Sequence, residues 1–166
     1  MILYFSATGN TQYAASRIAE ATDDTLVSVR ECIRNGRTHF ELKENENFGI
    51  VMPTYFQGVP LFLKEFIESI TLTADDTEHY SYAVSTCGVS YGNSGSEAVH
   101  AAQKAGIHLD ATFRIRMVDN WNPYFDMTDN DYIRTAEEST VKSRLARGRE
   151  KVKEVYEIPA IAAQRR

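Results

Sequence analysis

The sequence predicts a single α/β domain over residues 1–166, with a doubly wound parallel sheet of five strands in the order 2-1-3-4-5 and helices on both faces. Two observations predict it. Short apolar runs alternate with segments of helical periodicity, and a chain reaches a parallel neighbour only through such a crossover. The length of 166 residues also fits one hydrophobic core, and no Pro-, Gly- or Ser-rich linker divides the chain.

The expected strands are of two kinds. Four apolar runs are typical of strands buried on both faces, at residues 2–5, 26–29, 48–52 and 80–85. In residues 111–118, apolar side chains instead alternate with Arg114 and Arg116. Alternation indicates that one face is wet, so we expect this strand at an edge of the sheet.

The expected helices carry apolar residues at helical spacing. The clearest pattern is Leu63, Phe66, Ile67 and Ile70, at positions i, i+3, i+4 and i+7. Similar patterns occur at residues 14–19, at residues 98–105 before Gly106, and at residues 141–156. Residues 31–47 are polar and poorly periodic, so we predict no firm helix there.

Composition excludes several classes of function. A net charge of −5 and a pI of about 5.4 argue against nucleic acid as a partner. Cys32 and Cys87 form no metal-ligand pattern and no disulfide framework, and the four histidines are scattered, so we expect no metal. The apolar residues 1–5 are too short for a signal peptide or a membrane span. We therefore expect a cytoplasmic protein.

The loop after the first strand carries the strongest functional signal. It lies between a buried strand and a helix start and reads Ser6, Ala7, Thr8, Gly9, Asn10, Thr11. Gly9 permits a tight turn close to a ligand, while the hydroxyl groups and the N–H groups of the helix N-terminus suit a phosphate. The loop has no Lys of a nucleotide-binding P-loop, so a monoester phosphate fits better than a nucleoside triphosphate.

This loop resembles the Thr/Ser-x-Thr-Gly-x-Thr phosphate loop of the flavodoxins, which lies in the same place. The resemblance extends over nearly the whole chain, and is greatest to the flavodoxin half of bacterial proteins that carry a ferredoxin module. It implies a flavodoxin-like fold and FMN as the cofactor. The chain has no cysteine runs of an iron–sulfur module, so electrons are expected to pass to and from separate redox partner proteins, a reductase and an acceptor.

The loop after the third expected strand has two adjacent aromatics, Tyr55 and Phe56, that can cover a flat heterocycle. In flavodoxins this loop flanks the isoalloxazine, and a peptide beside a glycine contacts flavin N5. Gln57 and Gly58 match that peptide, and Gly58 is free to reach positive φ. The resemblance therefore implies that the loop residues bind the ring: Pro53, Thr54, Tyr55, Phe56, Gln57 and Gly58.

The loop after the fourth expected strand is rich in glycine and small polar residues, which let backbone donors approach a ring edge. Flavodoxin-like proteins use it to bind the pyrimidine end and to place an aromatic on the second face of the ring. The implied cofactor residues are Thr86, Cys87, Gly88, Tyr91, Gly92 and Asn93, with Tyr91 as the aromatic. A further aromatic segment around Trp121 either shields the flavin, receives a partner or packs under the last helix.

Three functions remain open at this stage. The first is an FMN-binding electron carrier that has no catalytic residue of its own. The second is a small FMN-dependent NAD(P)H:quinone or nitro-type reductase, although no second glycine-rich dinucleotide site is visible. The third is an interaction module that keeps the fold without the flavin. The carrier is the function that the sequence favours.

Overall fold

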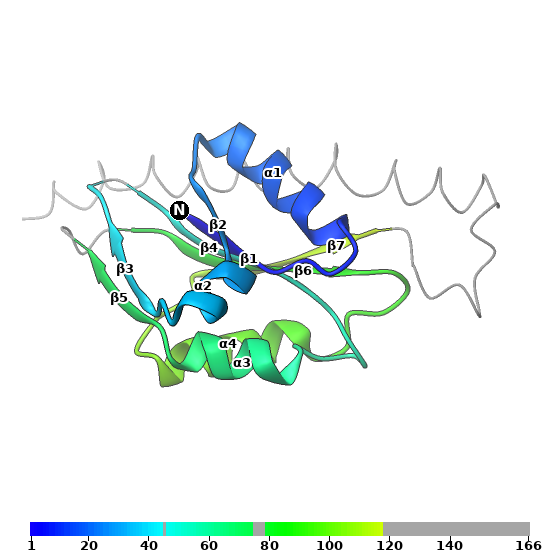
Figure 1. Ribbon diagram of the computed structural model, residues 1–166. Coiled ribbons are helices and arrows are strands. Elements are labelled where there is room, and N and C mark those ends of the chain that lie inside the picture. The colour runs from blue at the N-terminus through cyan, green and yellow to red at the C-terminus, as the bar shows by residue number, and fades with distance from the viewer. Residues whose placement is uncertain (45, 75–78, 118–166) are drawn as a thin grey trace, which may run out of the picture.

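The computed structural model describes residues 1–44, 46–74 and 79–117, and Figure 1 shows how they are arranged. Within these residues the chain forms, in order, β1 (Ile2–Tyr4), α1 (Asn10–Thr22), β2 (Leu26–Ser28), α2 (Val29–Asn35), β3 (His39–Leu42), β4 (Phe48–Pro53), α3 (Leu61–Glu68), β5 (Thr71–Ala74), β6 (Ser81–Cys87), α4 (Ser94–Lys104) and β7 (Ala111–Arg116). The expected helix at 141–156 and the Trp121 segment lie outside the described residues.

The main sheet has five parallel strands in the order β2-β1-β4-β6-β7. These are the five strands predicted from the sequence, and counted among themselves they follow the expected order 2-1-3-4-5. Over all described strands the numbering differs, because β3 and β5 form a separate two-stranded parallel sheet. The α/β prediction is confirmed, and the small sheet is an addition to it.

The small sheet and α2 fall where we predicted little regular structure. α2 begins at Val29, which we had placed in the second strand, and buries Val29 and Cys32. β3 then alternates exposed and buried residues, with Phe40 and Leu42 in the core. Two buried residues in a seven-residue helix give too little periodicity to be recognised in the sequence.

Helices cover both faces of the sheet. α1 lies above it in Figure 1 and packs Ala14, Ala15 and Ile18 against strand residues such as Ile2 and Val51. α3 and α4 lie below it and bury an apolar cluster against the other face: Leu63, Phe66, Ile67, Ala98, Ala101 and Ala102. These are the apolar faces predicted from the sequence. No helix in the described ranges is long and apolar enough to cross a membrane.

The edge strand behaves as its alternation predicts. β7 pairs only with β6 among the described strands. Ile115 is buried, whereas Arg114 and Arg116 are exposed. α4 also ends as expected, because its C-cap is Ala105 and Gly106 follows with φ +75°.

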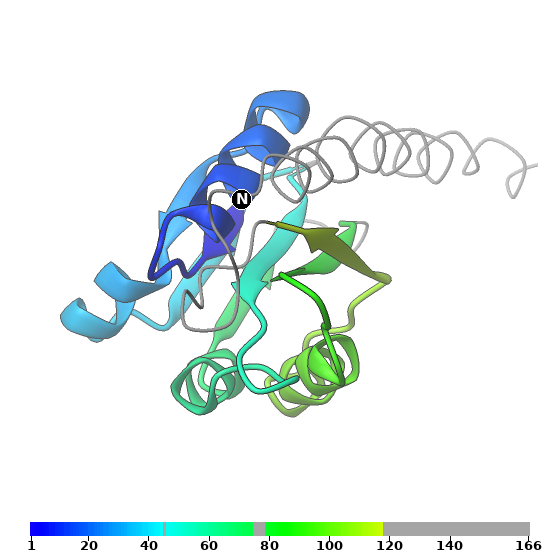
Figure 2. The ribbon, with the colours of Figure 1, turned by 90° about the vertical axis from the view of Figure 1, so that its right-hand side faces the viewer.

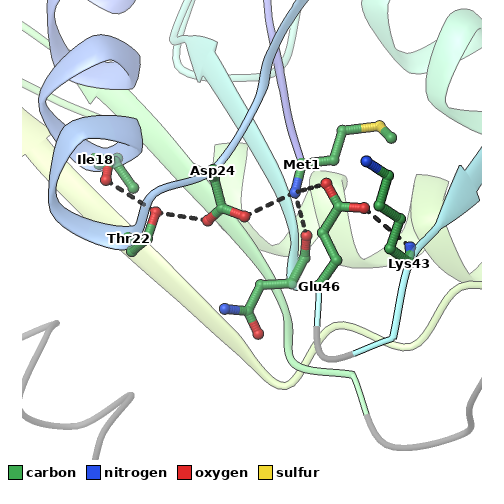
Figure 3. A network of polar contacts seen from close by, with 7 residues as sticks. Met1, Ile18, Thr22, Asp24, Lys43 and Glu46 are labelled. Carbon is green, nitrogen blue, oxygen red and sulfur yellow. Dashed lines mark hydrogen bonds and ion pairs between the residues drawn. The ribbon is translucent and has the colours of Figure 1, made fainter.

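A buried ionic cluster lies at the end of the sheet where the strands begin (Figure 3). The Met1 ammonium donates to Asp24 Oδ1 at 2.8 Å and to the Asn47 carbonyl at 2.6 Å, and lies 3.0 Å from Glu46 Oε1. Thr22 Oγ1 donates to the other Asp24 oxygen at 2.6 Å. Met1 and Asp24 are 10% and 6% exposed, so every charge in this cluster is paired away from bulk water.

Candidate functional site

Three loops meet at the opposite edge of the sheet. They follow the carboxyl ends of β1, β4 and β6, which are neighbours in the sheet. They lie at the right of Figure 1, and Figure 2 looks onto them end-on. The strand order therefore brings together the three loops that the sequence singled out.

The first loop ends in an uncapped helix. Gly9 is the N-cap of α1 with φ +100°, and its N–H donates to Ser6 Oγ at 3.1 Å. No side chain caps the helix and its first turn has no acidic residue. A Cβ built at Gly9 would meet no atom within 4 Å, so the space beside this turn is open. The N–H groups and the helix dipole thus suit an anion.

Thr11 makes a side-chain contact within the protein that the sequence analysis did not predict. It is buried, and its Oγ1 lies 2.8 Å from Thr86 Oγ1. Thr86 Oγ1 in turn donates to the Met52 carbonyl at 3.4 Å. This hydroxyl pair joins the first and third loops beneath the surface. A contact between Thr11 and a ligand stays a prediction. The group of Thr11 that suits such a contact is its backbone N–H, in the first turn of α1.

The second loop closes a tight turn. Tyr55 N–H donates to the Gly58 carbonyl at 2.9 Å, and Gly58 N–H donates to the Tyr55 carbonyl at 3.0 Å. The two central residues, Phe56 and Gln57, have φ of 48° and 64°, which makes this a type I′ turn. The left-handed residues of this turn are thus Phe56 and Gln57, and Gly58 itself does not have a positive φ.

The aromatics of this loop face outward. Phe56 is 100% exposed and Tyr55 is 39% exposed. Burial of the Tyr55 phenol still raises its pKa above the usual value. Left-handed residues with side chains are unfavourable and often cluster at functional sites, so the left-handed Phe56 makes this turn a candidate for a binding site.

The third loop is held by side chains from α4 and β7. The Arg114 guanidinium lies 3.7 Å from the centre of the Tyr91 ring, and Arg116 Nε donates to the Gly88 carbonyl at 3.0 Å. Ser94 Oγ donates to the Tyr91 carbonyl at 2.7 Å. One face of Tyr91 is therefore covered by Arg114, and contact of Tyr91 with a flavin ring stays a prediction.

The sequence analysis did not single out Ser94, Glu97, Arg114 or Arg116 as site residues. The alternation in residues 111–118 predicted that both arginines lie on one face of the strand. It did not predict that they contact the third loop. Glu97 Oε2 accepts from Val59 N–H at 2.9 Å and from Lys64 Nζ at 3.1 Å. Burial opposes ionisation of Glu97, but these two donors outweigh it and lower its pKa.

The predicted site residues differ in exposure. Seven of them are exposed to solvent, namely Ala7, Thr8, Gly9, Tyr55, Phe56, Gln57 and Asn93. Others are partly buried, namely Ser6, Asn10, Thr54, Cys87, Gly88, Tyr91 and Gly92. The rest are buried, namely Thr11, Pro53, Gly58 and Thr86. Among the described residues, no group of three or more His, Cys, Asp and Glu side chains is arranged to hold a metal ion.

Comparison with known families supports the functions that use a flavin. The family model described as flavodoxin matches residues 2–114, which include all three loops. The chain belongs to the flavodoxin family. FMN is the cofactor of this family, and the chain is a flavin-binding electron-transfer protein. The open, uncapped first turn and the exposed aromatics of the second loop fit this cofactor.

The solved structures to which this chain is similar have low sequence identity to it. A provisionally assigned flavoprotein from Bacteroides eggerthii is 18% identical, with a TM-score of 0.50 over 71% of this chain and 88% of that one. Flavodoxin 1 from Bacillus cereus is 17% identical, with a TM-score of 0.45 over 73% and 86%. A Fusobacterium nucleatum flavodoxin bound to flavin mononucleotide is 19% identical, with a TM-score of 0.43 over 72% and 77%. No curated protein matches the sequence.

Proposed function

We propose that this protein binds FMN non-covalently at the carboxyl edge of its sheet and carries electrons between a reductase and an acceptor protein. The observation that carries the proposal is the uncapped N-terminus of α1, which lies at the same edge as the aromatic turn of the second loop and the glycine-rich third loop. An anion site beside aromatic and backbone donor groups is what a phosphorylated flavin requires.

The first loop takes the phosphate in this proposal. Backbone N–H groups at the start of α1 donate to it, together with the Thr8 hydroxyl, while Ser6 shapes the turn through its bond to Gly9. The residues assigned to the phosphate are Ser6, Ala7, Thr8, Gly9, Asn10 and Thr11. The absence of an acidic residue in the first turn of α1 keeps this end of the helix positive.

The second and third loops take the ring. Tyr55, Phe56 and the Gln57–Gly58 peptide bind one side, preceded by Pro53 and Thr54. Tyr91 binds the other, and the remaining third-loop residues approach the ring edge: Thr86, Cys87, Gly88, Gly92 and Asn93. FMN supplies one- and two-electron transfer when bound, and the protein excludes water and sets access.

Phe56 supports a carrier over a reductase. A fully exposed aromatic beside the ring site suits contact with a partner protein, since aromatic residues are enriched in the cores of such interfaces. A carrier mixed with NADPH alone in a stopped-flow experiment stays oxidised, whereas rapid reduction without a reductase identifies the NAD(P)H-dependent enzyme. We place this carrier in the cytoplasm, which agrees with the lack of a disulfide between Cys32 and Cys87.

The phosphate assignment is tested by Thr8→Ala, with Thr25→Ala, at an exposed position before β2, as the matched control. Titration of apoprotein is expected to show FMN binding weakened at least about tenfold by Thr8→Ala, since a bond to a charged acceptor is lost. Riboflavin binding is expected to stay unchanged. Equal losses for both ligands would contradict the assignment, and a colourless parent that binds no FMN would contradict the proposed function.

A further inference from the structure

The turn of the second loop does not suit its own sequence. A type I′ turn favours Asn or Gly at its two central positions, where both residues have positive φ. Here those positions hold Phe56 and Gln57, whose side chains make left-handed backbone unfavourable. The two hydrogen bonds between Tyr55 and Gly58 close the turn. The left-handed backbone of Phe56 and Gln57 requires further stabilising contacts from other segments of the protein.

The third loop supplies that support. Asn93 N–H donates to the Gln57 carbonyl at 2.7 Å. Gly92, with φ +47°, lies so close that a Cβ built on it would be 2.1 Å from the Gln57 oxygen and 2.3 Å from the Gln57 Cβ. The backbone of the third loop is therefore pressed against the turn, and only glycine at position 92 allows this approach.

Further bonds fasten the second loop on both sides of the turn. Before it, Thr54 N–H donates to the Thr86 carbonyl at 2.8 Å, and Thr54 Oγ1 donates to Ser94 Oγ at 3.2 Å. After it, Val59 N–H donates to Glu97, whose carboxylate is paired with Lys64. The loop is thus attached to the third loop and to the first turns of α4 at points before, within and after the turn.

We infer that Gly92 and Asn93 are positioning residues, which fix the Gln57–Gly58 peptide so that the second and third loops bind the flavin ring as one preformed unit. This inference rests on the proposed FMN site. While the bond from Asn93 persists, the Gln57 carbonyl points to the third loop and the peptide does not rotate by itself. The turn then presents Tyr55 and Phe56 to the ring without further ordering, which favours binding.

The test is Gly92→Ala, with Gly36→Ala as the matched control. Gly36 also has a positive φ, +64°, but a Cβ there would meet no atom within 4 Å. Both variants carry the strain of a left-handed alanine, and only Gly92→Ala displaces the second loop. We expect Gly92→Ala to weaken FMN and riboflavin binding by the same factor, at least about tenfold, because the ring and not the phosphate loses its site.

A spectroscopic readout separates positioning from general destabilisation. At saturating riboflavin, emission of the bound flavin is expected to be stronger in Gly92→Ala than in the parent and in Gly36→Ala, since the aromatics of the second loop are no longer held against the ring. Binding and emission equal to those of Gly36→Ala would overturn the inference while leaving the FMN site intact. A parent that binds neither flavin would overturn the proposed function, and the inference with it.

Amide hydrogen exchange on the parent covers the case in which Gly92→Ala fails to fold. The inference requires the Asn93 and Gly58 amides to be protected and to exchange at linked rates, with protection of both rising when riboflavin binds. An Asn93 amide that exchanges like one in open solvent, or that responds independently of Gly58, would overturn it.

Discussion

The two ends of the sheet are built in opposite ways. At the amino end, the charges of Met1, Asp24 and Glu46 neutralise one another in a nearly dry cluster. At the carboxyl end, α1 begins without a cap, Phe56 and Gln57 have left-handed backbone, and Phe56 is fully exposed. These charges are paired within the protein at one end, whereas at the other end the first turn of α1 has no side-chain cap.

The difference shows how stability and binding are separated in one small domain. A parallel sheet sends every crossover back to the amino end, so that the loops at the carboxyl end are free to vary without breaking the sheet. Strain and open donors are tolerated there because the amino end and the two apolar layers hold the fold. We therefore expect substitutions at the amino end to change unfolding, and those at the carboxyl end to change flavin binding.

The largest effect is expected for Asp24→Asn. It removes the charge that faces the Met1 ammonium in a site where Asp24 is 6% exposed. We expect the free energy of unfolding to fall by about 2–3 kcal/mol, because Glu46 and the Asn47 carbonyl still hold the ammonium. Urea denaturation of the apoprotein measures it. Glu20→Gln is the control, since its pair with Arg17 is exposed and worth about 0.5 kcal/mol or less.

If flavin affinity of the folded Asp24→Asn protein fell as much as its stability, the two ends would be coupled and the comparison would be wrong. Equal effects of Asp24→Asn and Glu20→Gln on unfolding would show that the buried cluster contributes no more than a surface ion pair.

The second prediction concerns Thr11→Val, which keeps the side-chain shape and leaves Thr86 without its hydroxyl partner. We expect a loss of about 1–2 kcal/mol, since a buried hydroxyl then lacks one of its bonds. Thr25→Val at an exposed position is the control. A Thr11→Val protein as stable as the control would mean that the hydroxyl pair does not tie the first loop to the third.

The third prediction is a dependence on acid. Burial opposes ionisation of Glu46, but the N–H of Lys43 and the Met1 ammonium outweigh it and lower its pKa from the ordinary 4.5. A carboxyl with a lower pKa in the folded state stabilises the fold above its unfolded pKa, and this stabilisation is lost as the pH falls through the folded pKa. We expect unfolding free energy to decline below about pH 4.5, and Glu46→Gln to flatten that decline.

Glu97 gives the contrast at the other end, because its pKa is lowered in the same direction by Val59 and Lys64. We expect Glu97→Gln, like Glu46→Gln, to flatten the acid decline of unfolding free energy, and unlike it to change the acid dependence of riboflavin affinity, because Glu97 holds Val59 beside the second loop. Titrations of both variants from pH 6 downwards measure this, and an identical pattern for the two would erase the distinction between the ends.

The smallest effect on stability is expected for Phe56→Asn. Asn tolerates left-handed backbone better than Phe, and the fully exposed ring packs on nothing that folding requires. The melting temperature of the apoprotein is therefore expected to stay level or rise slightly, while FMN affinity falls. A clear loss of stability would show that Phe56 supports the fold and would place it with the amino-end residues.

Local patterns were enough to predict the main architecture. The apolar runs of β1, β4 and β6 and the amphipathic faces of α1, α3 and α4 depend on neighbours in sequence, and they appear as predicted. The strand β3 depends instead on a distant partner, since Phe40 lies opposite Leu72 in β5. Neither four-residue segment carries enough signal by itself, so the small sheet was missed.

The site was predictable as loops but not as contacts. Glycines and small polar residues identify where backbone approaches a ligand, and the strand order then brings those loops to one edge. The contact between Thr11 and Thr86 joins residues that are 75 positions apart. The hydrogen bond from Asn93 N–H to the Gln57 carbonyl forms only because the second and third loops meet. Such contacts are decided by how the elements pack, which no short window of the sequence contains.

The interior position of β1 in the sheet also matters while the chain is being made. Ile2 pairs with Leu26 on one side and with Gly49 on the other, so β1 gains its second neighbour only after residues 47 positions further on have been made. At synthesis rates of 5–20 residues per second this wait lasts roughly 2–9 seconds. A strand of only three residues, followed at once by the polar loop that starts at Ser6, exposes little adhesive edge in that interval. A strand this short limits the edge with which another chain can pair before β2 and β4 have been made.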